Sequence, residues 1–146
     1  MKNILVTGGY GFIGSNFVLQ EIAAGNKVIN LDKMTYAADK DNLSEVENNE
    51  NYSFIEGDIC DADLVAKIFN GHNKGWEIDW VVNFAAESHV DNSIEKPADF
   101  IETNIIGTYN LLQNSLKYFQ TNIGGEKKKN FRFLLISTDE VFGSLG

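Results

Sequence analysis

The sequence predicts an α/β fold: a doubly wound parallel sheet between two layers of helices, truncated after its fifth strand. Three observations predict it. Apolar runs alternate with helical patterns along the 146 residues, as in parallel sheets with crossover helices. These runs are nearly continuous, which suits strands buried on both faces. The first run leads straight into a glycine-rich turn and an amphipathic segment. Since there is no repeat, linker or second composition, one domain is expected.

Five strands are expected, at residues 3–7, 27–31, 52–56, 80–84 and 131–137. The clearest helix is expected at residues 97–119, where Pro97 suits the first turn because its missing N–H costs nothing there. Apolar residues recur in it at steps of four and three and form one stripe: Ile105, Tyr109, Leu112, Leu116 and Phe119. The polar segment 33–51 is expected to be a loop with at most a short helix, and the basic run 126–130, "EKKKN", a solvated loop.

The glycine-rich turn, "TGGYGFIGSN", follows the first strand. Gly8, Gly11 and Gly14 fit the pattern TGxxGxxG, and Gly9 with the last two also fits GxGxxG. Such glycines allow a tight turn, let the backbone approach a pyrophosphate and let the next helix pack closely on the sheet. Glycine also serves tight strand-to-helix turns that bind nothing. Here, however, the turn lies where a Rossmann-type dinucleotide-binding fold requires it, so a dinucleotide site is predicted.

Two acidic residues at strand ends would face the adenosine half of a dinucleotide. Asp32 lies eighteen residues after Gly14, where a carboxylate accepts hydrogen bonds from ribose hydroxyls and disfavours a 2′-phosphate, so NAD is expected rather than NADP. Lys33 weakens this expectation because a cation there could tolerate the phosphate. Asp58 ends the third strand and is a candidate for contact with the adenine, a turn-forming aspartate being the alternative.

The last expected strand ends abruptly in polar residues, "STDE". Ligands of open α/β sheets bind beyond the carboxyl ends of the strands, so Thr138, Asp139 and Glu140 are candidate catalytic residues. Two carboxyl groups, one protonated and one ionised, can divide the roles of acid and base. The alternative is a polar strand end that caps a following helix.

Composition excludes several classes of protein. A formal charge of −9 opposes binding to a nucleic-acid backbone, and no apolar run approaches the roughly 20 residues that span a bilayer. The single Cys60 cannot form an internal disulfide, and a packed thiol is expected rather than a catalytic one. No metal site is predicted. A cytoplasmic location is the default expectation.

Six motifs in this order, spread from Thr7 to Gly143, resemble the extended short-chain dehydrogenase/reductase superfamily, and within it the dTDP-glucose 4,6-dehydratases. The motifs are "TGGYGFIGSN", "LDKMTYA", "GDI", "NFAAESHVDNSI", "ETNIIGTYNLL" and "STDEVFG". The resemblance implies NAD as cofactor, held beside the glycines by the matching positions Phe12, Ile13, Asp32, Lys33, Met34, Thr35, Asp58, Ile59, Phe84, Ala85, Ala86, Glu87, Ser88 and Thr103. It also implies a nucleotide-sugar substrate, dTDP-glucose, in contact with Ser88 and Thr138.

The resemblance further implies a reaction. The C4 hydroxyl of the sugar is oxidised by NAD, water is eliminated across C5 and C6, and the hydride returns to C6. Asp139 would be the acid of the elimination, Glu140 the base, and Thr138 would orient the C4 hydroxyl. Rhamnose biosynthesis is the implied pathway.

The sequence also departs from the family. Arginine is usual at Asn92 and tyrosine at Phe142, so an ion pair and a hydroxyl near the site are missing. The catalytic Tyr-x-x-x-Lys of the superfamily is expected beyond Gly146, together with the region that binds the sugar nucleotide, and the chain is taken to lack both. We therefore expect the N-terminal cofactor-binding half of such an enzyme, inactive alone, whether an expression fragment or a natural truncation.

Association is expected from the topology. By fold analogy the sheet order is 3-2-1-4-5, which leaves strand 131–137 at an edge that later strands would cover. An apolar edge and an uncovered helix face favour pairing with another copy. Self-association is thus expected of this chain, and a homodimer of the full-length enzyme.

Two other functions fit parts of the sequence. A nucleotide-sugar 4-epimerase or decarboxylase of the superfamily shares the glycine turn but usually lacks an acid and base after the threonine. A non-catalytic NAD-binding module would explain an absent Tyr-x-x-x-Lys. Sequence downstream of Gly146 would separate these alternatives.

Overall fold

The structure is a computed structural model; it describes residues 1–138, 141 and 143, and of residues 90 and 92 the backbone alone. Its centre is a five-stranded sheet whose neighbouring strands all run parallel, in the order β3-β2-β1-β4-β5. This confirms the order expected from the sequence, and each expected strand is present with small shifts at its ends. The strands are β1 (Asn3–Thr7), β2 (Lys27–Asp32), β3 (Tyr52–Glu56), β4 (Trp80–Asn83) and β5 (Arg132–Leu135).

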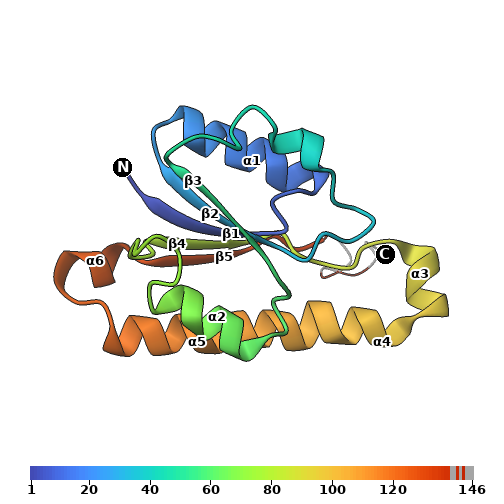
Figure 1. Cartoon of the computed structure of the whole chain (residues 1–146). Coiled ribbons are helices and arrows are strands. Elements are labelled where there is room, and N and C mark those ends of the chain that lie inside the picture. Colours follow the sequence, from blue (N-terminus) through green and yellow to red (C-terminus); the bar gives the residue numbers. More distant parts are fainter. Residues whose placement is uncertain (139–140, 142, 144–146) are drawn as a thin grey trace.

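Helices cover both faces of the sheet and make three layers (Figure 1). One face carries α1 (Phe12–Ala23) and the short 3₁₀ helix η1 (Lys40–Leu43). The other carries α2 (Ala62–Phe69) and a long helical rod made of α4 (Pro97–Phe100), η2 (Ile101–Gly107) and α5 (Thr108–Thr121). Two short helices, α3 (Val90–Glu95) and α6 (Gly125–Asn130), lie at opposite ends of the molecule.

Alternation along the strands builds a core on each face. In β1, Ile4 and Val6 belong to the core under α1, whereas Leu5 belongs to the core under α2 and α5. All three side chains are fully buried. Successive side chains of a strand point to opposite faces, so a strand buried on both faces needs an uninterrupted apolar run. That is why these strands could be found from the sequence.

The long helix differs from the expectation in its middle. Residues 97–121 are helical throughout, but η2 is a π-helix, in which one residue more than usual is fitted into a turn. Gly107, at the end of η2, is buried against the loop that follows β3. A Cβ on it would lie 2.6 Å from the Ile59 side chain. Glycine thus lets the rod approach the loop after β3.

Most of the apolar stripe of this helix does not pack on the sheet. Four of its five residues, Ile105, Tyr109, Leu112 and Leu116, are exposed by 44 to 60%, whereas Phe119 is partly buried against the core under α2 and α5. The face toward the sheet is a second set that mixes small, polar and apolar residues: Gly107, Asn110, Leu111, Ser115 and Tyr118. Periodicity located the exposed apolar stripe, but it did not reveal the second, buried face of the helix.

The basic run also differs from the expectation, because it forms α6 rather than a loop. Lys127 makes ion pairs with Glu77 (2.8 Å) and Asp79 (3.4 Å), and so ties α6 to the segment before β4. Burial works to lower the pKa of Lys127, but these carboxylates outweigh it and hold the pKa above its usual value. No helix in the described part of the chain is long and apolar enough to span a bilayer.

Candidate functional site

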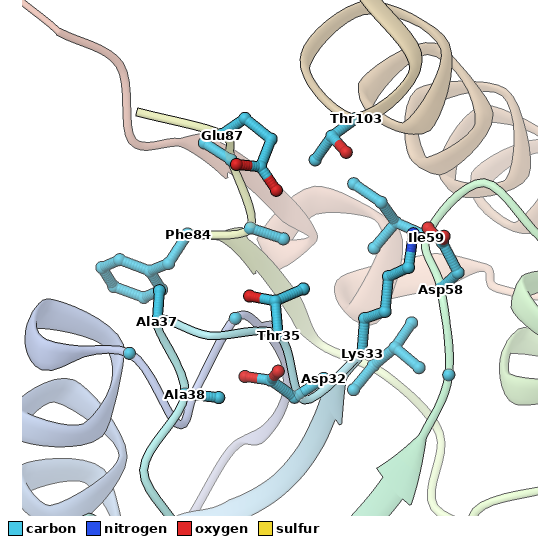
Figure 2. A pocket seen from close by; sticks show the side chains of 16 residues that line it. Asp32, Lys33, Thr35, Ala37, Ala38, Asp58, Ile59, Phe84, Glu87 and Thr103 are labelled. Atoms are coloured by element: carbon cyan, nitrogen blue, oxygen red, sulfur yellow. Dashed lines mark ion pairs between the residues drawn. The ribbon is translucent and has the colours of Figure 1, made fainter. Parts of the chain in front are cut away.

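A pocket lies at the carboxyl ends of β1 to β4, where the loops that follow these strands converge (Figure 2). Thr103, from η2, completes it. Open α/β sheets bind their ligands at this edge. The pocket is lined by Gly8, Gly11, Leu31, Asp32, Lys33, Thr35, Ala37, Ala38, Gly57, Asp58, Ile59, Phe84, Ala85, Ala86, Glu87 and Thr103.

The glycine turn brings bare backbone to the wall of the pocket. Gly8 has φ +71°, a conformation that glycine adopts at no steric cost, and a Cβ on it would lie 2.7 Å from the backbone N of Ala85. A Cβ on Gly14 would lie 2.3 Å from the carbonyl O of Gly8. Gly11 is the N-cap of α1 and supplies no side-chain cap. The first N–H groups of this helix therefore remain available to an anion.

Side chains of β2 hold this turn in place. The Gly9 N–H donates to Asn30 Oδ1 (3.0 Å), and the Tyr10 N–H donates to Asp32 Oδ2 (2.9 Å). Asn30 is fully buried and also donates from Nδ2 to the hydroxyl of Tyr52 (3.0 Å). Burial raises the pKa of Tyr52 far above its usual value. The hydrogen bonds of Asn30 and Asp32 pair the polar groups beneath the turn and fix the turn to strand β2.

Asp32 also shapes the loop that follows β2. Its Oδ1 accepts a hydrogen bond from the N–H of Met34 (2.9 Å), whose φ of +58° is rare for a residue with a side chain. Both carboxylate oxygens are therefore fixed by backbone N–H groups, one from the glycine turn and one from the loop after β2. Each oxygen keeps a lone pair for a further donor, such as a ribose hydroxyl.

Lys33 and Asp58 form an ion pair across the ends of β2 and β3, with 2.6 Å between Nζ and Oδ2 (Figure 2). The other oxygen of Asp58 accepts a hydrogen bond from the N–H of Cys60 (2.9 Å). Burial works to raise the pKa of Asp58, but these hydrogen bonds outweigh it and lower the pKa. The bond to Asp58 in turn raises the pKa of Lys33. Both groups are charged at neutral pH.

Cys60 itself is not set up as a nucleophile. Its thiol donates to the carbonyl O of Glu102 (3.2 Å). Burial, and then the neighbouring Asp58 carboxylate, raise the pKa of Cys60 to about 11. Since the thiolate is the reactive form, a thiol that stays protonated at neutral pH is unreactive.

The loop after β4 is held by a residue that the sequence did not single out. Asn104, in η2, accepts from the N–H of Glu87 and donates to its C=O, both at 2.8 Å. From the loop after β2, the hydroxyl of Tyr36 donates to the carboxylate of Glu87 (3.2 Å). Glu87 thereby joins the β4 loop to η2 and to the β2 loop.

A second pocket adjoins the first and leads toward the end of β5. The loop after β4 separates the two and lines both. Ser88 and Thr138, the two residues expected at the substrate, lie together in this second pocket. It is lined by Ala85, Ala86, Glu87, Ser88, Ser93, Phe100, Asn104, Thr108, Leu135, Ile136, Ser137 and Thr138.

The candidate residues thus separate into groups. Twelve of the seventeen expected cofactor residues line the first pocket, and Ser88 lines the second. Four expected residues line neither pocket: Phe12, Ile13, Gly14 and Met34. Of these, Phe12 and Ile13 are 83% and 61% exposed at the start of α1. Outside the described residues lie Asp139, Glu140, Phe142 and the Asn92 side chain.

Small residues account for most of the lining that sequence reasoning missed. Ala37 and Ala38 line the first pocket two and three positions beyond Thr35, and Gly57 lines it beside Asp58. Each lies within three positions of a predicted residue, so their small size near a motif was an available signal. Asn104 gave no such signal, because its partner is a backbone 17 positions away.

A Tyr-x-x-x-Lys spacing does occur, from Tyr36 to Lys40, so the expectation that the chain lacks this spacing was wrong. It lies in the loop between β2 and η1, and its tyrosine donates to Glu87. It precedes the paired acids in sequence, whereas the superfamily's motif is expected after them.

Glycines that carry the backbone to the pocket wall, and a fixed carboxylate at the end of the next strand, meet the requirements of a dinucleotide. In a parallel sheet of this order they define a protein of the Rossmann-type dinucleotide-binding class. Within that class, the family model described as GDP-mannose 4,6 dehydratase matches residues 5–146. The chain belongs to this family.

Curated relatives match all or nearly all of the chain. A dTDP-glucose 4,6-dehydratase of Xanthomonas campestris pv. campestris (strain B100) is 47% identical over 146 residues, which are 100% of this chain and 40% of the relative. A dTDP-glucose 4,6-dehydratase of Escherichia coli is 52% identical over 143 residues, 97% of this chain and 38% of the relative. The chain therefore spans about two fifths of the length of these relatives.

Solved structures of dTDP-glucose 4,6-dehydratases also match the chain. A dTDP-glucose 4,6-dehydratase from Bacillus anthracis str. Ames in complex with NAD has a TM-score of 0.79 and 36% identity, covering 100% of this chain and 40% of that one. A dTDP-glucose 4,6-dehydratase from Streptomyces venezuelae with NAD and TYD bound has a TM-score of 0.81 and 42% identity, covering 99% and 42%. The fold predicted from the sequence is confirmed.

Proposed function

We propose that this chain is the NAD-binding part of a dTDP-glucose 4,6-dehydratase, which converts dTDP-glucose to dTDP-4-keto-6-deoxyglucose. The relatives that match nearly all of it carry that name, and two solved neighbours hold NAD. In this proposal residues 1–146 form the NAD-binding domain, and the sugar nucleotide is bound largely by a region that they do not include. The reaction belongs to rhamnose biosynthesis in the cytoplasm.

The glycine turn is the observation that carries the proposal. A side chain at Gly8 would collide with the Ala85 backbone N at 2.7 Å, so only bare backbone fits this wall of the pocket. A side chain at Gly14 would collide with the Gly8 carbonyl O at 2.3 Å, so the helix start packs closely on the turn. A pyrophosphate needs such a wall, together with free N–H groups at a helix start. In this proposal Asp32 would accept hydrogen bonds from the ribose hydroxyls, and Asp58 would contact the adenine.

NAD, when bound, would accept a hydride from the sugar and return it. The chain's own residues would orient the sugar and move its protons. Thr138 lies in the second pocket with Ser88, where its hydroxyl would orient the sugar's C4 hydroxyl. Asp139 would donate a proton to the departing C6 hydroxyl, and Glu140 would take the proton from C5. One protonated and one ionised carboxyl group suit these two tasks.

Calorimetric titration tests the binding step. We expect heat with NAD, weaker binding of NADP, and no turnover of dTDP-glucose by this chain alone. The matched control is Gly8→Val, which fills the wall and should abolish the heat while the fold is checked by circular dichroism. Absence of heat with both nucleotides would contradict the proposal.

The roles of the acids are tested in the whole enzyme. Glu140→Gln should stop exchange of the sugar's C5 hydrogen with solvent deuterium, because no base remains to remove that proton. Exchange at the wild-type rate in this variant would remove Glu140 from the mechanism.

We also propose that the chain self-associates and that the whole enzyme is a homodimer. The exposed stripe on η2 and α5 supports association, as does β5, whose Leu134 and Leu135 are 51% and 45% exposed. Exposed apolar side chains gathered on one helix face and on an edge strand are typical of interfaces.

A further inference from the structure

The cofactor pocket contains a cation that could reverse its preference for NAD. A 2′-phosphate would add about two negative charges beside the Asp32 carboxylate, and proteins that accept this phosphate supply a cation for it. Among the described residues that line the pocket, Lys33 is the one cation, next to the carboxylates of Asp32, Asp58 and Glu87. Its side chain is 59% exposed and long enough to take several positions.

The structure shows where that cation is directed. The Lys33 side chain extends toward Asp58, whereas the Asp32 carboxylate points to the opposite side (Figure 2). Its ammonium lies 2.6 Å from Asp58 Oδ2. The Asp32 carboxylate is meanwhile held by the N–H groups of Tyr10 and Met34. The ribose position therefore has a fixed negative charge, and the neighbouring positive charge is engaged elsewhere.

Asp58 is itself held in the position that engages Lys33. Its second oxygen accepts the N–H of Cys60 at 2.9 Å, which orients the carboxylate within the turn after β3. Its side chain is 27% exposed, so the pair is less screened by water than a fully exposed pair. Adjacent parallel strands bring the ends of β2 and β3 together, since Asp32 pairs in register with Glu56.

We propose that Asp58 is a specificity-determining residue for the cofactor: it engages Lys33 and so prevents the lysine from neutralising a 2′-phosphate. This role is additional to a contact with the adenine. The inference rests on the proposed function, because it concerns the selectivity of the same NAD site. A lysine beside the ribose then leaves the preference for NAD over NADP intact as long as its partner carboxylate is present.

The test uses two probes of the adenosine half, AMP and adenosine 2′,5′-bisphosphate, titrated against the whole chain. The measured quantity is the ratio of the two dissociation constants. We expect wild type to prefer AMP at least fivefold. Asp58→Asn keeps the shape and the acceptor for Cys60 but removes the charge, and should shift the ratio about tenfold toward the bisphosphate.

Further variants show whether the shift acts through Lys33. Lys33→Met combined with Asp58→Asn should return the ratio to within about twofold of wild type. Glu47→Gln, which removes one exposed carboxylate elsewhere, should leave the ratio unchanged and so controls for net charge. If Asp58→Asn fails to fold, Asp58→Ser repeats the test with a hydroxyl as acceptor for Cys60.

Two results would overturn the inference while NAD binding stands: an unchanged ratio when Asp58 is replaced, or a shift that persists without Lys33. Wild type that binds neither AMP nor NAD would overturn the proposed function, and this inference with it.

Discussion

Asn104 holds the backbone of Glu87 by both of its polar groups: its side-chain oxygen accepts the Glu87 N–H and its side-chain nitrogen donates to the Glu87 C=O, each at 2.8 Å. A side-chain amide matches a peptide group in this way because it offers one donor and one acceptor side by side. The pair fixes the loop between β4 and α3, which lines both pockets, to the helical rod.

Asn104→Leu should therefore loosen that loop. The two unpaired backbone groups should cost about 1–3 kcal/mol of folding stability, measured by urea unfolding, and NAD affinity should fall about tenfold in calorimetry. Asn114→Leu is the matched control, because the Asn114 side chain bonds to Asn110 within the same helix rather than to a loop. Wild-type NAD affinity in Asn104→Leu would show that the loop is held by other contacts.

Gly14→Ala should destabilise the protein although alanine is the better helix former. Helix propensity alone favours alanine by up to about 1 kcal/mol, but the added Cβ would lie 2.3 Å from the Gly8 carbonyl O. We expect a net loss of about 1–3 kcal/mol in urea unfolding and weaker NAD binding. Gly124→Ala meets nothing within 4 Å and should change stability by less than about 0.5 kcal/mol. Equal effects of the two changes would rule out the steric argument.

Alkaline pH should destabilise the fold through Tyr52. Burial raises its pKa in the folded protein well above the ordinary value of 10.0. Below pH 10 the folded and the unfolded protein both keep the proton on Tyr52, so its contribution to the folding stability is fully present. Above pH 10 the unfolded chain loses the proton while the folded one retains it, and stability falls by up to about 1.4 kcal/mol per pH unit. Urea unfolding from pH 9 to 12 should show this extra slope in wild type and not in Tyr52→Phe. Parallel curves for the two proteins would contradict it.

Leu112→Lys should reduce self-association. Leu112 is 44% exposed in the middle of the apolar stripe, and a charge there would have to be desolvated in any contact between copies. Light scattering at increasing concentration should show a dissociation constant raised about tenfold or more. Gln113→Lys adds the same charge at the adjacent exposed position and should have little effect. Monomeric mass of the wild type at every concentration would exclude self-association itself.

The sheet and the glycine turn were predictable because their signals are local. A strand buried on both faces must be apolar throughout, as the run "NILVT" is, and a turn without room for a Cβ must be glycine. The direction of the long helix was not predictable from its period. Leu112 and Leu111 are neighbours in sequence, yet one is exposed and the other fully buried. A period identifies a face but not what covers it.

The site's connections were less accessible to sequence reasoning for a related reason. Lys33 and Asp58 are neighbours because the ends of adjacent strands meet, and the role of the lysine was ambiguous until its partner was visible. Asn104 bonds to a backbone, which carries no residue-type signal. Asp139 and Glu140 stay predictions from the resemblance.

The π-helical segment has a consequence for the length of the chain itself. Thr103 and Asn104 face the pockets from one end of the rod, while Leu111 and Tyr118 pack into the core from the other. A helical residue turns the chain by about 100°, so deleting one residue between Gly107 and Asn104 would rotate one end against the other. The first pocket would lose the Thr103 hydroxyl and the second the Asn104 amide, although every functional side chain would still be present. In this segment the number of residues is as much a determinant of the site as their identity.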